Sequence, residues 1–307
     1  MRNARLIATL MIVLASQDLT AQMVIGGSTP AATAVLDLQS TSKGLLPPRL
    51  TSVQRNAIVS PATGLTLYNT NLKIVETYNG SLWVNSATGE ATGCGAMTSG
   101  TTWRDFMCHN LGANTALNPL SPHFALLGHY YQWGRNPQCF GQDGLDEDNP
   151  CASPVYGASG PWGATAANDN AGSITSWNIN DAKNGSWTTS GGEKTFKDPC
   201  PSGYRLPTRL EWDSVLTSNT LTSVGTWSNS TTNFSAGKMV GTRLYLPAAG
   251  YREGSDGTLF ERGIAGYYWS STENAISSAW GLKVENTLLG TNSFPRTNGF
   301  SVRCIKM

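Results

Sequence analysis

The 307-residue sequence predicts a loop-rich, largely β protein of the α+β class. Its 33 glycines, together with abundant Ser, Thr and Asn, favour turns and short strands over helices. The stretch Gly203–Asp213, Gly-Tyr-Arg-Leu-Pro-Thr-Arg-Leu-Glu-Trp-Asp, predicts a short strand, a break at Pro207 and then a helix. Thr208 is the expected N-cap of that helix, and Glu211 completes a capping box.

Residues 1–21 have the pattern of a secretory signal peptide. Arg2 and Arg5 form a basic start, Leu6–Ala15 is an apolar run too short to span a bilayer, and Leu19-Thr20-Ala21 suits cleavage. No later segment is apolar enough to cross a membrane. We therefore expect export by the Sec pathway, to the cell surface or into the medium.

Charge and motif content argue against several functions. Only 13% of the residues are charged and the formal net charge is +1, so we expect neither nucleic acid nor an anionic membrane surface as a partner. The sequence has no Gly-x-Ser-x-Gly, no His-Glu-x-x-His and no glycine-rich phosphate loop. These absences favour a protein that is not an enzyme.

Residues 22–93 are predicted to form a small β-rich stalk or spacer. Short strands are expected at 65–69, 74–78 and 82–84, with a tight turn at Asn79-Gly80. A Leu-Pro-Pro-Arg motif (46–49) precedes a Tyr-Asn-Gly…Trp hairpin (78–83). In this pattern the segment resembles the N-terminal stalks of secreted Bacteroidota surface proteins. Its few large apolar side chains make a thin core, so it either packs on the main domain, forms a homo-oligomer or serves as a monomeric spacer. Stalks of phage fibres offer a trimeric analogy.

The six cysteines predict a disulfide framework. An even number in an exported chain indicates three bonds, for which fifteen pairings are possible. Proximity in the sequence and closure of one domain favour the pairs Cys94–Cys108, Cys139–Cys151 and Cys200–Cys304. A zinc site is not expected, because there is no Cys-x-x-Cys and the three histidines lack the spacing of ligands.

The main domain is expected at 94–307, with a long loop insert at about 135–199. The insert holds an acidic cluster, and Asp143, Asp146 and Asp148 are weak candidates for binding Ca²⁺. Their spacing does not match an EF-hand loop, so a solvated loop without metal is the alternative. No other cofactor is expected.

Four blocks in the main domain carry a family resemblance. They are Gly-Tyr-Arg-Leu-Pro-Thr-x-x-Glu-Trp (203–212), Leu-Pro-Ala-Ala-Gly-Tyr-Arg (246–252), Gly-Tyr-Tyr-Trp-Ser-Ser-Thr (266–272) and Gly-Phe-Ser-Val-Arg-Cys (299–304). In this order they resemble the Fibrobacter succinogenes major paralogous domain, which is similar to the formylglycine-generating branch of the C-type lectin fold. The resemblance implies a C-type-lectin-like domain. Enzymes of that branch use two cysteines near the C-terminus, where this chain has Cys304 alone.

The same resemblance implies a ligand surface near the C-terminus, built around the last strands. Tyr, Trp, Ser and Asn side chains suit such a surface because they bind at a low entropic cost, although packing in the core is the alternative for Trp280. The candidates are Tyr267, Tyr268, Ser271, Thr272, Glu273, Asn274, Ser277, Trp280, Asn292 and Arg296.

We therefore expect an exported, surface-associated adhesin-like protein that binds a glycan or protein ligand without catalysis. One alternative is a structural component of the envelope or matrix without a discrete ligand. The other is an oxidase of the formylglycine-generating type.

Overall fold

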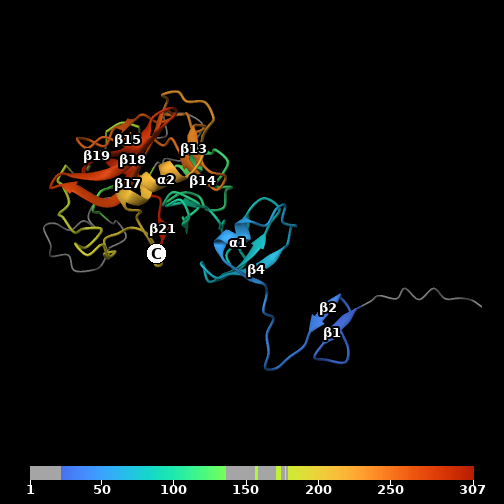
Figure 1. Ribbon diagram of the computed structural model, residues 1–307. Helices are drawn as coiled ribbons and strands as arrows, with labels where there is room; N and C mark the ends of the chain where they lie inside the picture. The colour runs from blue at the N-terminus through green and yellow to red at the C-terminus, as the bar shows by residue number, and fades with distance from the viewer. Residues whose placement is uncertain (1–21, 136–155, 158–170, 174–176, 178) are drawn as a thin grey trace, which may run out of the picture. The chain divides into compact units, whose positions relative to one another are not determined.

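The computed structural model describes residues 22–135, 156–157, 171–173, 177 and 179–307 (Figure 1). The described chain is mostly β, with two short α-helices, as its composition predicted. It divides into two compact units at residues 47 and 48. Residues 48–93 therefore share a unit with the C-terminal part of the chain, although the predicted boundary lay at residue 93. The predicted signal peptide lies outside the described residues.

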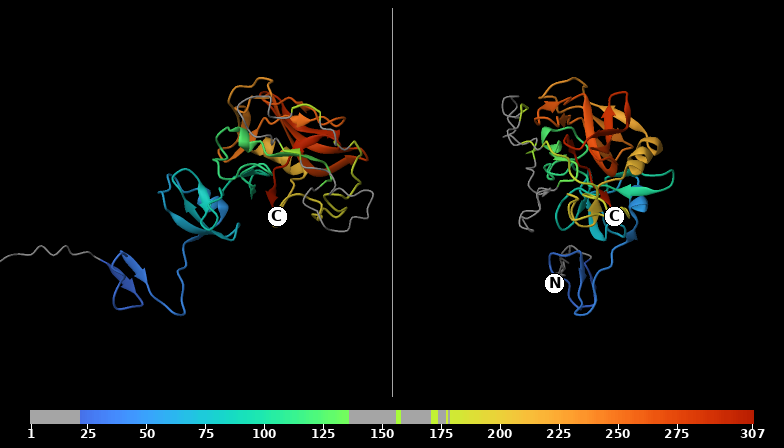
Figure 2. Two further views of the ribbon diagram at one scale, coloured as in Figure 1. Left: turned by 180° about the vertical axis from the view of Figure 1, so that it is seen from behind. Right: turned by 90° about the vertical axis from the view of Figure 1, so that its left-hand side faces the viewer.

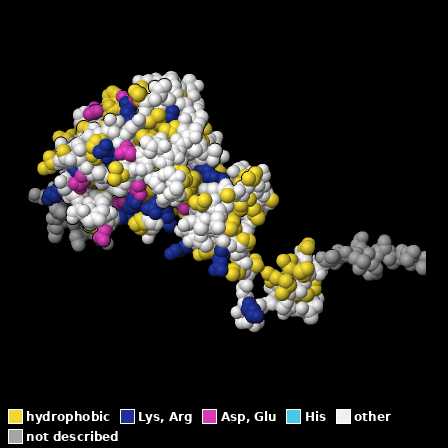
Figure 3. All heavy atoms as spheres, in the orientation of Figure 1, with side chains coloured by type: hydrophobic (Ala, Val, Ile, Leu, Met, Phe, Trp, Pro, Cys, Tyr) yellow, Lys and Arg dark blue, Asp and Glu magenta, His cyan; other side chains and the backbone are white. Residues whose placement is uncertain are grey.

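The first unit contains one two-stranded parallel sheet. Its strands are β1 (Met23–Ile25) and β2 (Leu36–Leu38), and Met23 pairs with Leu36 while Ile25 pairs with Leu38. These four side chains are exposed, at 59%, 54%, 56% and 44% of their area respectively. Side chains alternate along a strand, so all four lie on one apolar face. Figure 3 shows hydrophobic side chains gathered on the surface of this unit.

The second unit begins with a four-stranded sheet in the order β3-β4-β5-β6. The strands are β3 (Arg49–Leu50), β4 (Thr66–Asn69), β5 (Ile74–Tyr78) and β6 (Trp83–Asn85). The strands predicted at 65–69, 74–78 and 82–84 are thus confirmed. Gly80 has a φ of +98°, which the predicted Asn-Gly turn requires. The short helix α1 (Ser52–Asn56) starts at the capping box of Thr51 and Gln54.

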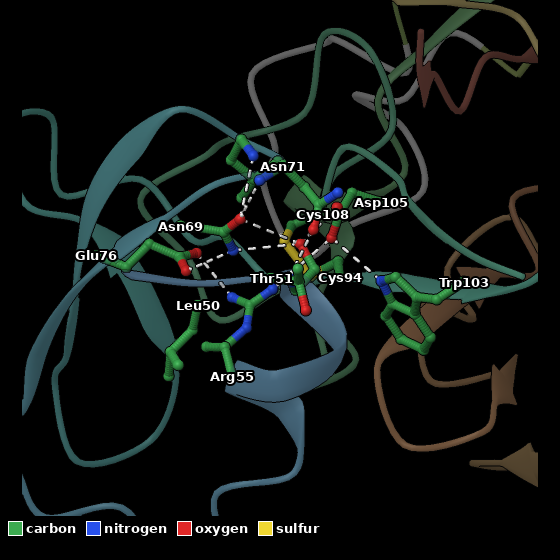
Figure 4. A network of polar contacts seen from close by, with 12 residues as sticks. Leu50, Thr51, Arg55, Asn69, Asn71, Glu76, Cys94, Trp103, Asp105 and Cys108 are labelled. Carbon is green, nitrogen blue, oxygen red and sulfur yellow. Dashed lines mark hydrogen bonds and ion pairs between the residues drawn. A yellow bond between two sulfur atoms is a disulfide. The ribbon is translucent and has the colours of Figure 1, made fainter. Parts of the chain in front are cut away.

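Buried charged side chains join α1 and β5 to the next strand pair (Figure 4). That pair is β7 (Gly95–Met97) and β8 (Trp103–Asp105). Arg55 of α1 is fully buried, and its Nη1 donates a 2.7 Å hydrogen bond to the equally buried Glu76. Asp105 accepts a 2.6 Å hydrogen bond from Ser52 and lies 3.7 Å from Nη2 of Arg55. This network fixes residues 48–93 against the strands that follow.

The C-terminal part is built on an eight-stranded half-barrel sheet. Six of its strands follow the order β10-β9-β20-β17-β18-β19, while β15 pairs with β20 and β16 pairs with β15. These strands are β10 (Tyr156–Gly157), β9 (His129–Gln132), β20 (Gly299–Ser301), β17 (Ala265–Ala275), β18 (Ser278–Glu285), β19 (Leu289–Pro295), β15 (Tyr251–Arg252) and β16 (Leu259–Phe260). The last strand in this order, β19, forms the edge of the sheet beside β18. Figure 2 shows this C-terminal part, coloured yellow to red, from two further sides.

Smaller elements surround this sheet. They are the 3-10 helix η1 (Phe124–Leu126), the pair β11 (Tyr204–Arg205) and β21 (Ile305–Lys306), and the three-stranded sheet β12 (Leu221–Val224), β13 (Gly237–Val240) and β14 (Leu244–Pro247).

The predicted capped helix is present as α2 (Arg209–Ser218). Thr208 accepts a hydrogen bond from the backbone N–H of Glu211, and the Glu211 carboxylate accepts one from the backbone N–H of Thr208. Arg205 donates two hydrogen bonds, of 2.8 and 2.7 Å, to the same carboxylate. The helix packs against β17, β18 and β19, with Trp212 fully buried beneath it (Figure 1).

Apolar cores cover both faces of the half-barrel sheet. One face packs Tyr131, Trp133, Tyr267, Trp269 and Phe300, and the other packs Trp212, Leu246, Tyr268, Leu282 and Val284. Two disulfides, Cys94–Cys108 and Cys200–Cys304, brace this part of the chain. Both pairings agree with the predicted ones, whereas the third predicted pair, Cys139–Cys151, lies outside the described residues.

Candidate ligand-binding surface

Four of the predicted ligand residues belong to the core and not to the surface. Tyr267, Tyr268, Ser271 and Arg296 are all buried. The hydroxyl of Tyr268, for example, donates a 2.7 Å hydrogen bond to the backbone oxygen of Pro247. The physical reason is that β17 has an apolar core on each side, so neither set of its alternating side chains is free over most of its length.

Arg296 holds backbone segments together. Its guanidinium donates 2.7 Å hydrogen bonds to the backbone oxygens of Ala182 and Ala275 and to the side chain of Asn184. It also stacks over the ring of Trp133, with 4.3 Å between the guanidinium carbon and the ring centroid. A side chain with this many internal contacts is committed to the fold, so a ligand role for Arg296 has no support.

Three predicted residues are exposed. Asn274 and Ser277 lie where β17 turns into β18, and the Asn274 amide donates a 2.8 Å hydrogen bond to Ser293. Asn292 is exposed on the edge strand β19. The structure therefore brings the accessible polar groups to the free edge of the half-barrel sheet.

The other three predicted residues are partly buried and face α2 or its neighbours. The guanidinium carbon of Arg209 lies 3.5 Å from the ring centroid of Trp280 and covers it. Thr272 accepts a hydrogen bond from the backbone N–H of Arg209, and Glu273 accepts one from Gly185. These contacts connect the end of β17 to the start of α2 and to the loop that contains Gly185.

A groove of about 550 Å³ lies on the face of β18 and β19 opposite Trp280. Gly290 leaves its centre open, because a Cβ atom built there would meet only the Asn292 amide, at 3.9 Å. The groove is lined by Lys283, Glu285, Leu288, Leu289, Gly290, Asn292 and Phe294.

Aromatic rings extend from Phe294 in this groove, through Tyr267 of β17, to the strands β15 and β16. The ring of Phe260, which is 46% exposed, stacks on Tyr251 at a centroid distance of 5.9 Å and an interplanar angle of 29°. Tyr251 lies 4.8 Å from Tyr267, which contacts Phe294 and Phe300 in turn. The exposed ring of Phe260 is thus supported by a continuous aromatic column that ends in the core.

Charged groups flank the aromatic column. Glu261 accepts a 2.5 Å hydrogen bond from the hydroxyl of Tyr267. The ammonium of Lys283 lies 3.3 Å from the same Glu261 oxygen and 2.6 Å from Glu285. Glu261 also has a φ of +57°, in the left-handed region that a glutamate seldom adopts. We name Tyr251, Phe260, Glu261, Lys283 and the groove together the aromatic trough.

The ionisation states in the trough follow from burial and from these partners. Burial raises the pKa of Tyr267, and the hydrogen bond to Glu261 raises it further, so the hydroxyl stays protonated and donates. Burial also raises the pKa of Tyr251. Desolvation alone would lower the pKa of Lys283, but Glu285 and Glu261 outweigh it and raise that pKa, so the ammonium keeps its charge.

The sequence contained one signal for the trough that the predicted surface did not use. In β18, Lys283 and Glu285 alternate with the buried Leu282 and Val284, which marks the charged pair as a separate face. Phe260 and Glu261 carried no such signal, because β16 is only two residues long.

Other predicted sites find no support in the described residues. The described ranges contain no group of three or more His, Cys, Asp or Glu side chains that could hold a metal ion. The weak Ca²⁺ candidates Asp143, Asp146 and Asp148 lie outside these ranges. In the part of the chain that the structure covers, no helix is long and apolar enough to cross a bilayer.

Comparison with known proteins relates two segments to families. Residues 24–104 are similar to a family described as a phage tail like trimerisation region, and residues 227–305 to a domain of unknown function (DUF8237). No curated protein and no solved structure matches the chain.

The resemblance to the Fibrobacter succinogenes major paralogous domain and the formylglycine-generating branch is therefore wrong. Its blocks at 246–252, 266–272 and 299–304 fall within the segment that matches DUF8237. The residues of these blocks pack in the interior of the protein. β17 lies between two apolar cores, and Arg303 is fully buried and donates a hydrogen bond to Asn110. Unrelated β proteins share such packing needs, so the blocks do not define the family. The C-type-lectin-like architecture that they implied has no support.

Proposed function

We propose that this chain is an exported, non-catalytic binding protein that works as a homotrimer. Residues 24–104 join three copies of the chain. The half-barrel part of each copy presents a surface for a glycan or protein ligand. The two disulfides support export, because such bonds persist in oxidising compartments outside the cytoplasm.

The observation that carries this proposal is the exposed apolar face of β1 and β2. Parallel sheets are almost always covered on both faces, and two strands alone are too few for independent stability. Here Met23, Ile25, Leu36 and Leu38 face outward. The similarity of residues 24–104 to a trimerisation region favours two further copies of the same chain as the cover.

The test is the mass of the mature protein in solution. Light scattering coupled to gel filtration is expected to give three times the mass of one chain. Replacing Ile25 and Leu38 by Asp places two charges on the apolar face and should yield single chains. The matched control is Leu210→Asp, because Leu210 is also exposed but lies on α2, outside the matched segment. A wild-type protein with the mass of one chain would contradict the proposal.

A structural component without a discrete ligand is the second candidate. Two features of the sequence favour it. Only 13% of the residues are charged in a chain rich in Gly, Ser and Asn, and the catalytic motifs named above are absent from the sequence. Arrays of glycans and of peptides, probed with the mature protein, separate the two candidates. Saturable binding to a defined ligand supports the binding protein, and its absence on both arrays supports the structural component.

A further inference from the structure

The aromatic trough offers a rigid platform for a flat apolar surface. Phe260 is 46% exposed, and its ring stacks on the ring of Tyr251. Tyr251 is itself fixed against the buried Tyr267. The motion of these stacked rings is therefore already restricted before a ligand binds to Phe260. Little further side-chain entropy is lost on binding, which favours affinity.

The polar groups beside this platform alternate as acceptors and donors. The side chains of Glu261 and Glu285 are 32% and 26% exposed, and the side chain of Lys283, whose ammonium pairs with both carboxylates, is 26% exposed. Asn292 adds one amide donor and one amide acceptor on the neighbouring strand. Such an array can pair with several adjacent hydroxyl groups at once, since each hydroxyl both donates and accepts.

Charge narrows the class of ligand further. The carboxylates of Glu261 and Glu285 lie 3.3 and 2.6 Å from the single ammonium of Lys283, so these three side chains together carry one net negative charge. The resulting negative excess disfavours sulfated, phosphorylated and uronic acid ligands. A cationic peptide is also disfavoured, because Lys283 already occupies the position between two carboxylates where a ligand cation would bind.

From these groups we infer that the aromatic trough binds an uncharged saccharide chain. One sugar ring stacks on Phe260, and neighbouring hydroxyls pair with Glu261, Lys283 and Asn292. The inference rests on the proposed binding function and names the ligand class and the residues that function would use.

The test uses the mature protein on an array that carries both uncharged and acidic oligosaccharides, followed by titration of the best uncharged hit. We expect binding to uncharged members only. Phe260→Ala should weaken that binding at least tenfold. Gly290→Gln should do the same by filling the groove from its open side, where a Cβ atom meets no backbone. The matched control is Phe196→Ala, which removes another exposed ring at a position outside the trough and should change affinity less than twofold.

Each outcome bears on the inference. Binding to an uncharged glycan that survives both Phe260→Ala and Gly290→Gln would overturn it and leave the proposed binding function standing. Binding only to acidic glycans, or only to members of a peptide array, would overturn it in the same way. No binding on either array would overturn both. Circular dichroism and melting of each variant confirm that a loss of binding is not a loss of fold.

Discussion

Removal of the Arg55 guanidinium tests the buried network that joins α1 and β5 to β8. Arg55→Met leaves the carboxylates of Glu76 and Asp105 inside the protein, at 0% and 6% exposure, without their cation. Breaking a buried ion pair by deleting one partner typically costs about 3–5 kcal/mol. Glu76 keeps a 2.8 Å hydrogen bond from Asn69, and Asp105 keeps one from Ser52, so the lower end is expected, at about 3 kcal/mol.

The second variant removes one of the two buried charges that Arg55→Met leaves without a cation, the carboxylate of Glu76. Arg55→Met combined with Glu76→Leu replaces the ion pair by two apolar side chains of similar size. Apolar replacement of a whole buried pair is often neutral or stabilising, so the double variant should recover at least about 1 kcal/mol relative to Arg55→Met. A control is Arg104→Met, because Arg104 is 36% exposed and lies 3.9 Å from Glu211, where an ion pair contributes at most about 1 kcal/mol.

Guanidinium chloride denaturation, followed by tryptophan fluorescence at one fixed protein concentration, measures the free energy of unfolding of each variant. A fixed concentration matters because assembly contributes to the apparent stability. The reasoning is refuted if Arg55→Met costs less than about 1 kcal/mol. It is also refuted if the double variant is as unstable as the sum of the two single replacements, because the charges would then act independently.

Three further predictions concern the second unit and its connection to the first. Burial alone would raise the pKa of Glu211, but the hydrogen bonds from Arg205 outweigh it and hold that pKa below its ordinary 4.5. The stabilisation is therefore present above about pH 4.5 and lost as the pH falls through the folded-state pKa, so the stability gap between wild type and Glu211→Gln should narrow in acid. A constant gap from pH 6 to pH 3 would contradict this. Replacing both Cys200 and Cys304 by Ser opens a loop of 104 residues and should cost up to about 4.7 kcal/mol, seen as a lower melting temperature; unchanged melting would contradict the closure role. A protease of broad specificity should cut first within residues 39–46, which are exposed and lie outside any helix or strand; a first cut within residues 85–93 would place the flexible connection there instead.

Local chemistry explains the features that the sequence predicted well. The capping box of Thr208 and Glu211 depends on residues three apart, and the Asn79-Gly80 turn depends on adjacent ones. The pairing of Cys200 with Cys304 is not local, but it followed from the idea that the two ends of one domain meet. The structure confirms this through the adjacent β11–β21 pair.

Burial on both faces of the sheet explains why four of the predicted ligand residues do not lie on the surface. The run Tyr267-Tyr268-Trp269-Ser270 looks polar and aromatic enough for a surface, yet each side chain is buried. A strand sequence does not reveal that a helix covers one face while strands and loops cover the other. The trough combines residues from the four strands β15, β16, β18 and β19 and from the turns beside them, so one stretch of sequence could not reveal the whole of it.

The left-handed backbone of Glu261 bears on how related chains should be engineered. A non-glycine residue in this conformation costs about 1–2 kcal/mol, and a partly exposed ion pair with Lys283 returns at most about 1 kcal/mol of it. Directed evolution for heat resistance alone should therefore favour glycine or asparagine at position 261 and discard the carboxylate. A library screened for retained binding should keep glutamate there, so the residue recovered at this one position reports which of the two selections governed the outcome.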